Sequence, residues 1–158
     1  DKMTEFEGCP SSKMFDFRNK EPQKGTSTVK VESQLRQWPI QLHLISPQAP
    51  YYQGADVLLV ADCVAYALGS FHTDYLKGKS IAIACPKLDE GQDIYVEKIK
   101  SWLEDAKINT LTVLIMQVPC CMGLLELARQ AAQSSKRKVP IKSVVVSLQG
   151  EILSEDWA

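Results

Sequence analysis

The sequence predicts an α/β domain in three layers, with a mostly parallel sheet of about five strands between two layers of helices. Three observations favour this class. Apolar segments alternate with helix-like segments from residue 57 to residue 148. The apolar segments are continuous, as expected for parallel strands that are covered on both faces. The helix-like segments place apolar residues three and four positions apart, so that each has one buried face. This combination is typical of Rossmann-like and flavodoxin-like sandwiches.

The expected elements follow one another in a regular order. A first strand at 40–45 ends before Ser46 and Pro47, and a short helix or turn at 49–53 is closed by Gly54. The remaining elements are a strand at 57–61, a helix at 64–76, a strand at 80–84, a helix at 93–107, a strand at 111–118, a helix at 122–134 and a strand at 141–148. Residues 151–158 are interpreted as an exit segment that packs against the body of the domain.

The composition indicates one domain and excludes several classes of partner. A chain of 158 residues with 45% apolar content buries about two-thirds of its unfolded surface. We therefore expect an irregular N-terminal arm at 1–34, which carries Cys9, and a single α/β domain at 35–158. A net charge of −1 gives no basic field for nucleic acid, and no segment reaches the roughly 18 to 20 apolar residues that span a bilayer. A cytoplasmic protein with reduced cysteines and without nucleic-acid or membrane partners is expected.

Cysteines mark the ends of the predicted strands. Cys63, Cys85, Cys120 and Cys121 lie where apolar strands end and helices begin. In an open α/β sheet the carboxyl ends of the strands line the ligand crevice, and helix N-termini favour the thiolate that binds iron or zinc. If the arm adds Cys9, these thiols are sufficient for a four-thiolate centre. All five cysteines are therefore predicted cofactor and metal ligands.

The cysteines and the two histidines also have other interpretations. A single cysteine is often a small core residue, but core cysteines have no reason to gather at strand ends. Consecutive residues rarely bind one ion, so either Cys120 or Cys121 is a packing residue, or the two bind different irons of a cluster. The absence of Cys-x-x-Cys argues against a thioredoxin-like dithiol, a ferredoxin ligand run and a zinc knuckle. His72 is interpreted as a surface or capping group, and His43 as a core or interface residue.

Several segments resemble the C-terminal domain of ferredoxin-type (4Fe–4S) iron–sulfur proteins from anaerobic microbes. They are residues 35–44, 54–67, 71–79, 84–89 and 118–123, together with the arm around Cys9. In that family a ferredoxin module with two cluster-binding cysteine runs commonly precedes this domain. The resemblance therefore implies electron transfer with a ferredoxin-like module or another redox partner protein. This chain contains neither cysteine run.

The expected function is iron–sulfur cluster binding, with a 4Fe–4S cluster held by cysteines at the strand ends, and a role in electron transfer. The alternative is a redox-active thiol or zinc-binding domain that acts as a sensor or interaction module without electron transfer. A weaker third reading is a small-molecule enzyme that uses an open iron position. No motif names a substrate, so the pattern favours a cluster-binding protein over a stand-alone enzyme.

Overall fold

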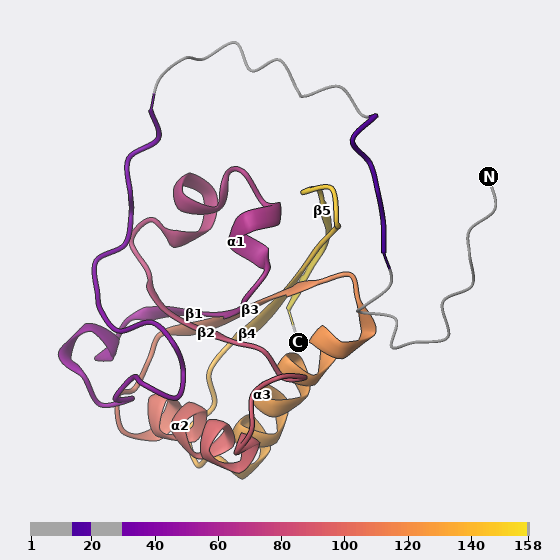
Figure 1. The fold of residues 1–158 in the computed structure, drawn as a ribbon. Coiled ribbons are helices and arrows are strands. Elements are labelled where there is room, and N and C mark those ends of the chain that lie inside the picture. Colours follow the sequence, from indigo (N-terminus) through magenta and orange to yellow (C-terminus); the bar gives the residue numbers. More distant parts are fainter. Residues whose placement is uncertain (1–13, 20–29, 158) are drawn as a thin grey trace.

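The computed structural model describes residues 14–19 and 30–157 and confirms the predicted α/β sandwich. Its sheet has five strands in the order β2-β1-β3-β4-β5 (Figure 1). The strands are β1 Asp56–Ala61, β2 Ser80–Ala84, β3 Thr110–Met116, β4 Ile141–Val146 and β5 Ile152–Trp157. The first four are parallel to one another, and β5 pairs with β4 in the antiparallel direction.

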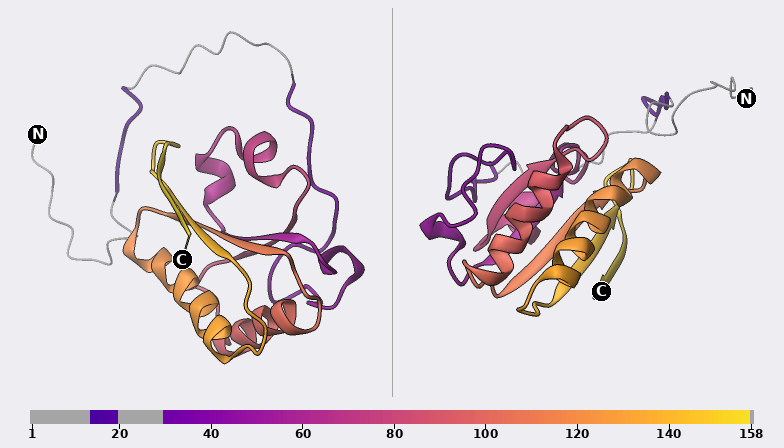
Figure 2. Two further views of the ribbon diagram at one scale, coloured as in Figure 1. Left: turned by 180° about the vertical axis from the view of Figure 1, so that it is seen from behind. Right: turned by 90° about the horizontal axis from the view of Figure 1, so that it is seen from below.

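Helices cover the two faces of this sheet unequally. One face carries α2 (Gln92–Glu104) and α3 (Met122–Ser134), which lie side by side (Figure 2). The opposite face carries only the short α1 (Val64–Ala67) and the π-helical turn η3 (Phe71–Leu76). No helix in the described part of the chain is long and apolar enough to cross a membrane.

The direction in which the chain adds strands reverses at β1. The chain passes from β1 to the edge strand β2 through α1 and η3, and then returns across the other face through α2 to β3 on the far side of β1. In doubly wound folds the carboxyl ends of the strands form a ligand crevice at this reversal. The segments that follow β1, β2 and β3 are therefore the expected location of a ligand site.

The core lies between the sheet and the two long helices. Five of the six residues of β1 and six of the seven residues of β3 are buried, so these central strands face protein on both sides. Tyr95, Ile99 and Trp102 bury the inner face of α2, and Leu124 and Ala128 bury that of α3. The predicted helical periodicity is thus the pattern that the core uses.

The predicted strand at 40–45 is wrong. Ile40 and Leu42 exchange backbone hydrogen bonds with Ile83 at the edge of β2, but this contact remains an isolated bridge. The chain then turns, because the carbonyl oxygens of Leu42, His43 and Ile45 all accept hydrogen bonds from the Lys98 ammonium group of α2, at 2.8 to 2.9 Å. The apolar Leu42 and Ile45 are buried as expected, but His43 is exposed and is not a core residue.

The helix predicted at 64–76 is divided into α1 and η3. Leu68 leaves the helical conformation with φ −98° and ψ 100°, and the chain re-enters a helical turn only at Phe71. The exit segment predicted at 151–158 contains a strand, β5, because the chain reverses tightly through Gly150 (φ +85°) and pairs with β4. The Lys142–Glu155 ion pair (3.3 Å) joins these two strands.

Gly150 connects the β4–β5 turn to α1. Its positive φ favours glycine, and an added Cβ would collide with the carbonyl oxygen of Ala67 at the end of α1. We expect Gly150→Ala to lower the free energy of unfolding by about 2 kcal/mol or more, because steric overlap adds to backbone strain. Gly78→Ala is the matched control, because Gly78 also has a positive φ but has open space around it. Urea titration measures the free energy of unfolding of both variants. An equal decrease in the two would contradict the contact between Gly150 and Ala67.

Lys98 holds the loop that replaces the predicted first strand. Removing its three hydrogen bonds in Lys98→Met should lower the free energy of unfolding by about 1 to 2 kcal/mol, because three carbonyl groups lose a charged donor. Lys100→Met on the same helix should change it by less than about 0.5 kcal/mol. Urea denaturation measures both values. A loss no larger for Lys98→Met than for Lys100→Met would show that other contacts hold the loop.

Candidate functional site

Three adjacent parallel strands deliver thiols to one edge of the sheet. Cys63 follows β1, Cys85 follows β2, and Cys120 and Cys121 lie in the 3-10 turn η4 (Pro119–Cys121) after β3. Because β1 lies between β2 and β3, Cys63 takes the central position. The predicted placement of these cysteines at the carboxyl ends of the strands is confirmed. We call Cys63, Cys85, Cys120 and Cys121 the four-thiol group.

Strand register sets the level at which each thiol leaves the sheet. Ala61 of β1 pairs with Ala84 of β2, so Cys63 and Cys85 follow the same rung by two residues and one residue. On the other side of β1, Val60 pairs with Leu114, and β3 continues to Met116 before η4 begins. The cysteines that follow these three strands therefore all lie close to the point where the strand order reverses.

The members of the four-thiol group influence one another electrostatically. Burial raises the pKa of the Cys63 thiol first, and Asp62, Cys85 and Cys120 raise it further. Burial also raises the pKa of Cys121 to about 11, with further increases from Cys120 and Cys63. A hydrogen bond with the backbone of Met116 acts in the opposite direction. Cys63 and Cys121 thus lie in surroundings where adding negative charge is unfavourable.

This environment differs from the one expected at helix N-termini. The sequence predicts that these positions favour the thiolate, but the pKa values of Cys63 and Cys121 are raised. The helix that follows Cys63, α1, has only four residues, and burial together with the neighbouring Asp62 carboxylate raises the pKa of this thiol. The thiols of Cys63 and Cys121 are therefore protonated at neutral pH in the absence of a cation.

The four thiols differ in exposure and do not form a ready-made metal site. Cys63 is exposed, Cys85 and Cys120 are half-buried, and Cys121 is buried. Among residues 14–19 and 30–157, no three His, Cys, Asp or Glu side chains are positioned to hold a metal ion. Cys9, the predicted fifth ligand, lies outside the described residues. Metal binding by the four-thiol group would require its side chains to move closer together.

Asp89 organises the loop that carries Cys85. Its carboxylate accepts hydrogen bonds from the Cys85 amide (2.9 Å), from the buried Tyr95 hydroxyl and from the Gln41 side chain (3.2 Å). Its own amide donates to the Cys85 carbonyl oxygen at 2.9 Å. From the sequence, Asp89 is expected to be a solvated polar group, and these hydrogen bonds show that it instead has a structural role. Its position four residues after Cys85 and three residues before the start of α2 is the signal that indicates such a loop-closing aspartate.

Close packing joins the loop after β2 to the start of α3. A Cβ added at Gly123 would lie 3.2 Å from Cβ of Pro86 and 3.7 Å from its Cγ. Pro86 directly follows Cys85, and Gly123 lies two residues after Cys121. The absence of a side chain at Gly123 therefore lets the Cys85 loop and the Cys121 segment approach each other.

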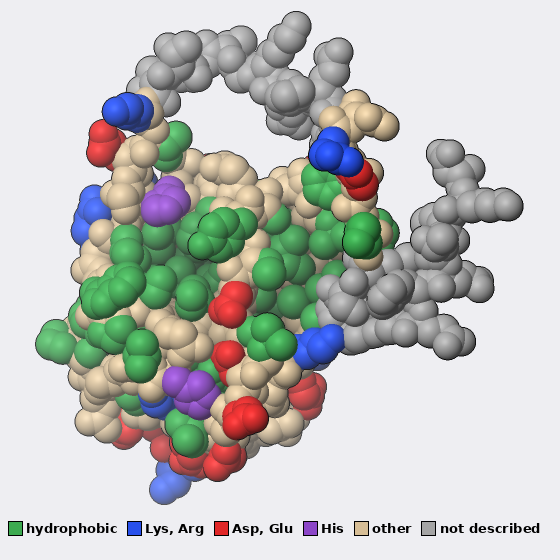
Figure 3. Space-filling model, viewed as in Figure 1, with side chains coloured by type: hydrophobic (Ala, Val, Ile, Leu, Met, Phe, Trp, Pro, Cys, Tyr) green, Lys and Arg blue, Asp and Glu red, His purple; other side chains and the backbone are tan. Residues whose placement is uncertain are grey.

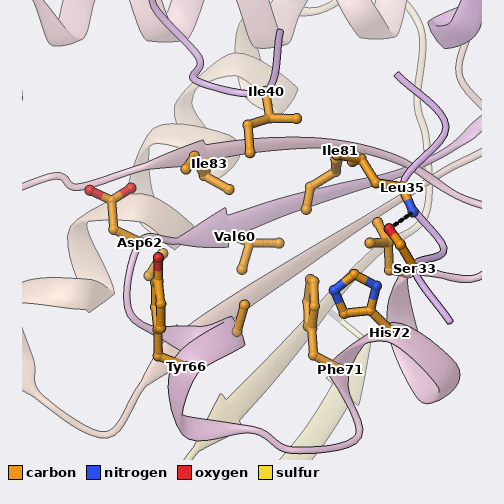
Figure 4. Close-up of a pocket in the computed structure, with 13 residues that line it drawn as sticks. Ser33, Leu35, Ile40, Val60, Asp62, Tyr66, Phe71, His72, Ile81 and Ile83 are labelled. Atoms are coloured by element: carbon orange, nitrogen blue, oxygen red, sulfur yellow. Dashed lines mark hydrogen bonds between the residues drawn. The ribbon is translucent and has the colours of Figure 1, made fainter. Parts of the chain in front are cut away.

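His72 lies apart from this arrangement, as the sequence analysis expected. Its Nδ1 accepts a hydrogen bond from the Gln34 backbone amide at 3.1 Å, and its ring packs edge-on against Phe71. In the cavity drawn in Figure 4, His72 lies at the end opposite Asp62, which is next to Cys63 in the chain. His72 thus binds the backbone of the segment before the domain core, and its interpretation as a surface or capping group stays a prediction.

Exposed apolar side chains accompany the thiols. Tyr66, Leu88 and Met122 are 93%, 76% and 49% exposed, and each lies within three residues of a cysteine of the four-thiol group. Large apolar side chains that remain exposed near one edge are typical of surfaces that contact another molecule. Three large apolar side chains are thus exposed close in sequence to the four-thiol group.

Comparison with known proteins supports the fold of this chain. Residues 49–158 match the family model of a Rossmann-like domain. An uncharacterized protein of Archaeoglobus fulgidus is 27% identical over 121 residues, which cover 75% of this chain and 83% of the relative. No solved structure matches the chain.

The expected membership in the ferredoxin-type iron–sulfur proteins is wrong. The matching family model is Rossmann-like, the archaeal relative carries no iron–sulfur description, and the described residues hold no preformed metal-ligand group. Most of the segments that suggested that resemblance are instead strands of a doubly wound sheet and the turns that follow them. The chain belongs to the Rossmann-like domain family.

Proposed function

We propose that the four-thiol group binds an iron–sulfur cluster and that the domain transfers electrons through it. The observation that carries this proposal is the delivery of thiols by three adjacent parallel strands to the reversal point of the sheet. The proposal rests on this placement and not on any family resemblance. Cys9 is the proposed additional ligand from the N-terminal arm.

The chemistry of the donor set fits such a cluster. Cysteine thiolates are the usual protein ligands of 4Fe–4S clusters, and this edge provides four thiols from three separate segments. Burial is the main cause that keeps Cys63 and Cys121 protonated, and the neighbouring thiols add to it. A bound cationic centre would favour their thiolate forms, because it offsets the cost of burial and the repulsion between thiolates. Bound there, the cluster would supply one-electron redox chemistry.

The surrounding residues would position these ligands. Asp89 holds the backbone of Cys85, and the contact between Gly123 and Pro86 keeps the β2 and β3 exits together. Cys63, Cys85 and Cys120 lie on turns rather than within strands, so their side chains can rotate without breaking the sheet. Cys121 is buried, which favours Cys120 as the ligand of the adjacent pair.

Electron transfer by one centre requires a partner. The exposed Cys63 places the proposed cluster near the surface, and Tyr66, Leu88 and Met122 offer apolar contacts around it. We propose a redox partner protein that docks over this edge. The apolar contacts would bring the two redox centres close without requiring a large interface.

Metal analysis tests the cluster directly. We expect the full chain, reconstituted without oxygen with iron, sulfide and zinc present, to bind iron and acid-labile sulfide and to become brown. Cys63→Ser and Cys85→Ser should each lose most of the bound iron, because each removes the only thiol at its strand end. Cys120→Ser should lose more iron than Cys121→Ser. Lys77→Ala, on an exposed residue away from this edge, should retain all of it.

Two results would contradict the cluster. Stoichiometric zinc without iron would assign the thiols to the alternative zinc-binding role. Full iron content in both Cys63→Ser and Cys85→Ser would show that any iron is bound elsewhere. Urea titration of each variant separates the loss of a ligand from the loss of the fold.

Thiol reactivity tests the alternative of a redox-active thiol. Because the pKa of Cys63 is raised, the metal-free protein should react with iodoacetamide at Cys63 more slowly at neutral pH than the same protein in urea. The rate of Cys63 alkylation should increase with pH, and this increase should occur at higher pH in the folded protein than in the unfolded chain. Asp62→Asn should speed the reaction by removing a charge that raises this pKa, whereas Asp93→Asn should not. A folded protein that reacts faster than the unfolded one would instead indicate an activated thiol, and mass spectrometry of the Cys63 peptide measures both rates.

A further inference from the structure

A cavity of about 370 Å³ opens on the face of the sheet that carries α1 and η3 (Figure 4). Its volume is in the range of small-molecule pockets. Its apolar lining comes from three separate parts of the chain, which are the sheet, the η3 turn and the segment at 33–40. The main apolar residues are Val60, Ile81, Ile83, Phe71, Leu35 and Ile40. In Figure 3 hydrophobic side chains gather across this side of the molecule, with acidic groups among them.

The cavity exists because α1 is short. A helix running through residues 64–76 would cover this part of the sheet, but the chain leaves the helical conformation at Leu68. Hydrogen bonds hold the opposite wall in place. The Gln34 amide donates to His72, and the Gln37 side chain both donates to the Ile81 carbonyl oxygen (2.9 Å) and accepts from its amide (2.7 Å). The walls of the cavity are therefore built into the fold.

The two ends of the cavity carry different polar groups. Asp62 and Tyr66 lie at one end, and His72 and Ser33 lie at the other (Figure 4). Because His72 Nδ1 accepts the Gln34 amide proton, the neutral ring carries its proton on Nε2 and offers a donor there. The cavity thus has an apolar centre, with a carboxylate at one end and a hydrogen-bond donor at the other.

The carboxylate end lacks a positive charge. No lysine or arginine lines the cavity, and within the described residues no basic side chain pairs with Asp62. A carboxylate without a basic partner at the end of an apolar cavity interacts favourably with a cation and unfavourably with an anion.

We propose that this cavity is a binding site for a small organic cation, an amine with an aromatic or aliphatic body. The body would fill the apolar centre, and the ammonium group would pair with Asp62. No cysteine of the four-thiol group lines this cavity, although Asp62 is next to Cys63 in the chain and acts on it electrostatically. The inference does not depend on the presence of a cluster.

Two matched probes test the proposal on the full chain. 4-Phenylbutylamine and 4-phenylbutyrate share one skeleton and carry opposite charges. Isothermal titration should show binding of the amine, with the acid weaker by about tenfold or more. Asp62→Asn should reduce the affinity for the amine by about tenfold and remove most of the difference between the probes.

Filling the cavity provides the second test. Ala65 is exposed on α1 and lines the cavity, so Ala65→Trp should abolish binding of the amine while the protein stays folded. Gln133→Trp, on an exposed position of α3 across the sheet, is the control and should bind as the unchanged protein does. Absence of amine binding, equal binding of the two probes, or amine binding that survives Ala65→Trp would each overturn the proposal. Urea titration confirms that each variant is folded.

Discussion

The parallel pairing of β1 with both β2 and β3 is the constraint on which the rest of the structure depends. It buries β1 on both faces and requires crossover segments to cover the sheet. It also directs the carboxyl ends of three neighbouring strands to the same edge. Cys63, Cys85 and Cys120 become neighbours for this reason, although up to 57 positions separate them in the chain.

Local contacts then give that edge its chemical character. Asp89 holds the turn at Cys85, and the small Gly123 lets this turn pack against the start of α3. Burial and neighbouring thiols keep Cys63 and Cys121 protonated, and Asp62 adds to this effect at Cys63. These features describe an edge that favours a cation over an activated nucleophile, which is why cluster binding is proposed ahead of thiol exchange.

The unequal helix layers give the protein a second feature of functional interest. The face covered by α2 and α3 is tightly packed, whereas the division of the other layer into α1 and η3 leaves a cavity lined by the sheet. The β4–β5 turn supports α1 through the close approach of Gly150 to Ala67. A turn distant in the chain thus packs against the end of α1, the helix that follows Cys63 and lines the cavity.

The sequence by itself determined the fold class, the parallel strands β1 to β4, the two long helices and the position of four cysteines at strand ends. These features follow from continuous apolar runs and helical spacing, which are local patterns. The described structure alone decided that residues 40–45 turn away under Lys98, that the helix predicted at 64–76 is divided, that β5 joins the sheet and that Asp89 closes the Cys85 loop. Each depends on a partner distant in the chain or on a turn geometry that apolar spacing does not encode. The direction of the thiol pKa shifts also required the structure, because burial and neighbouring charges exist only once the chain is folded.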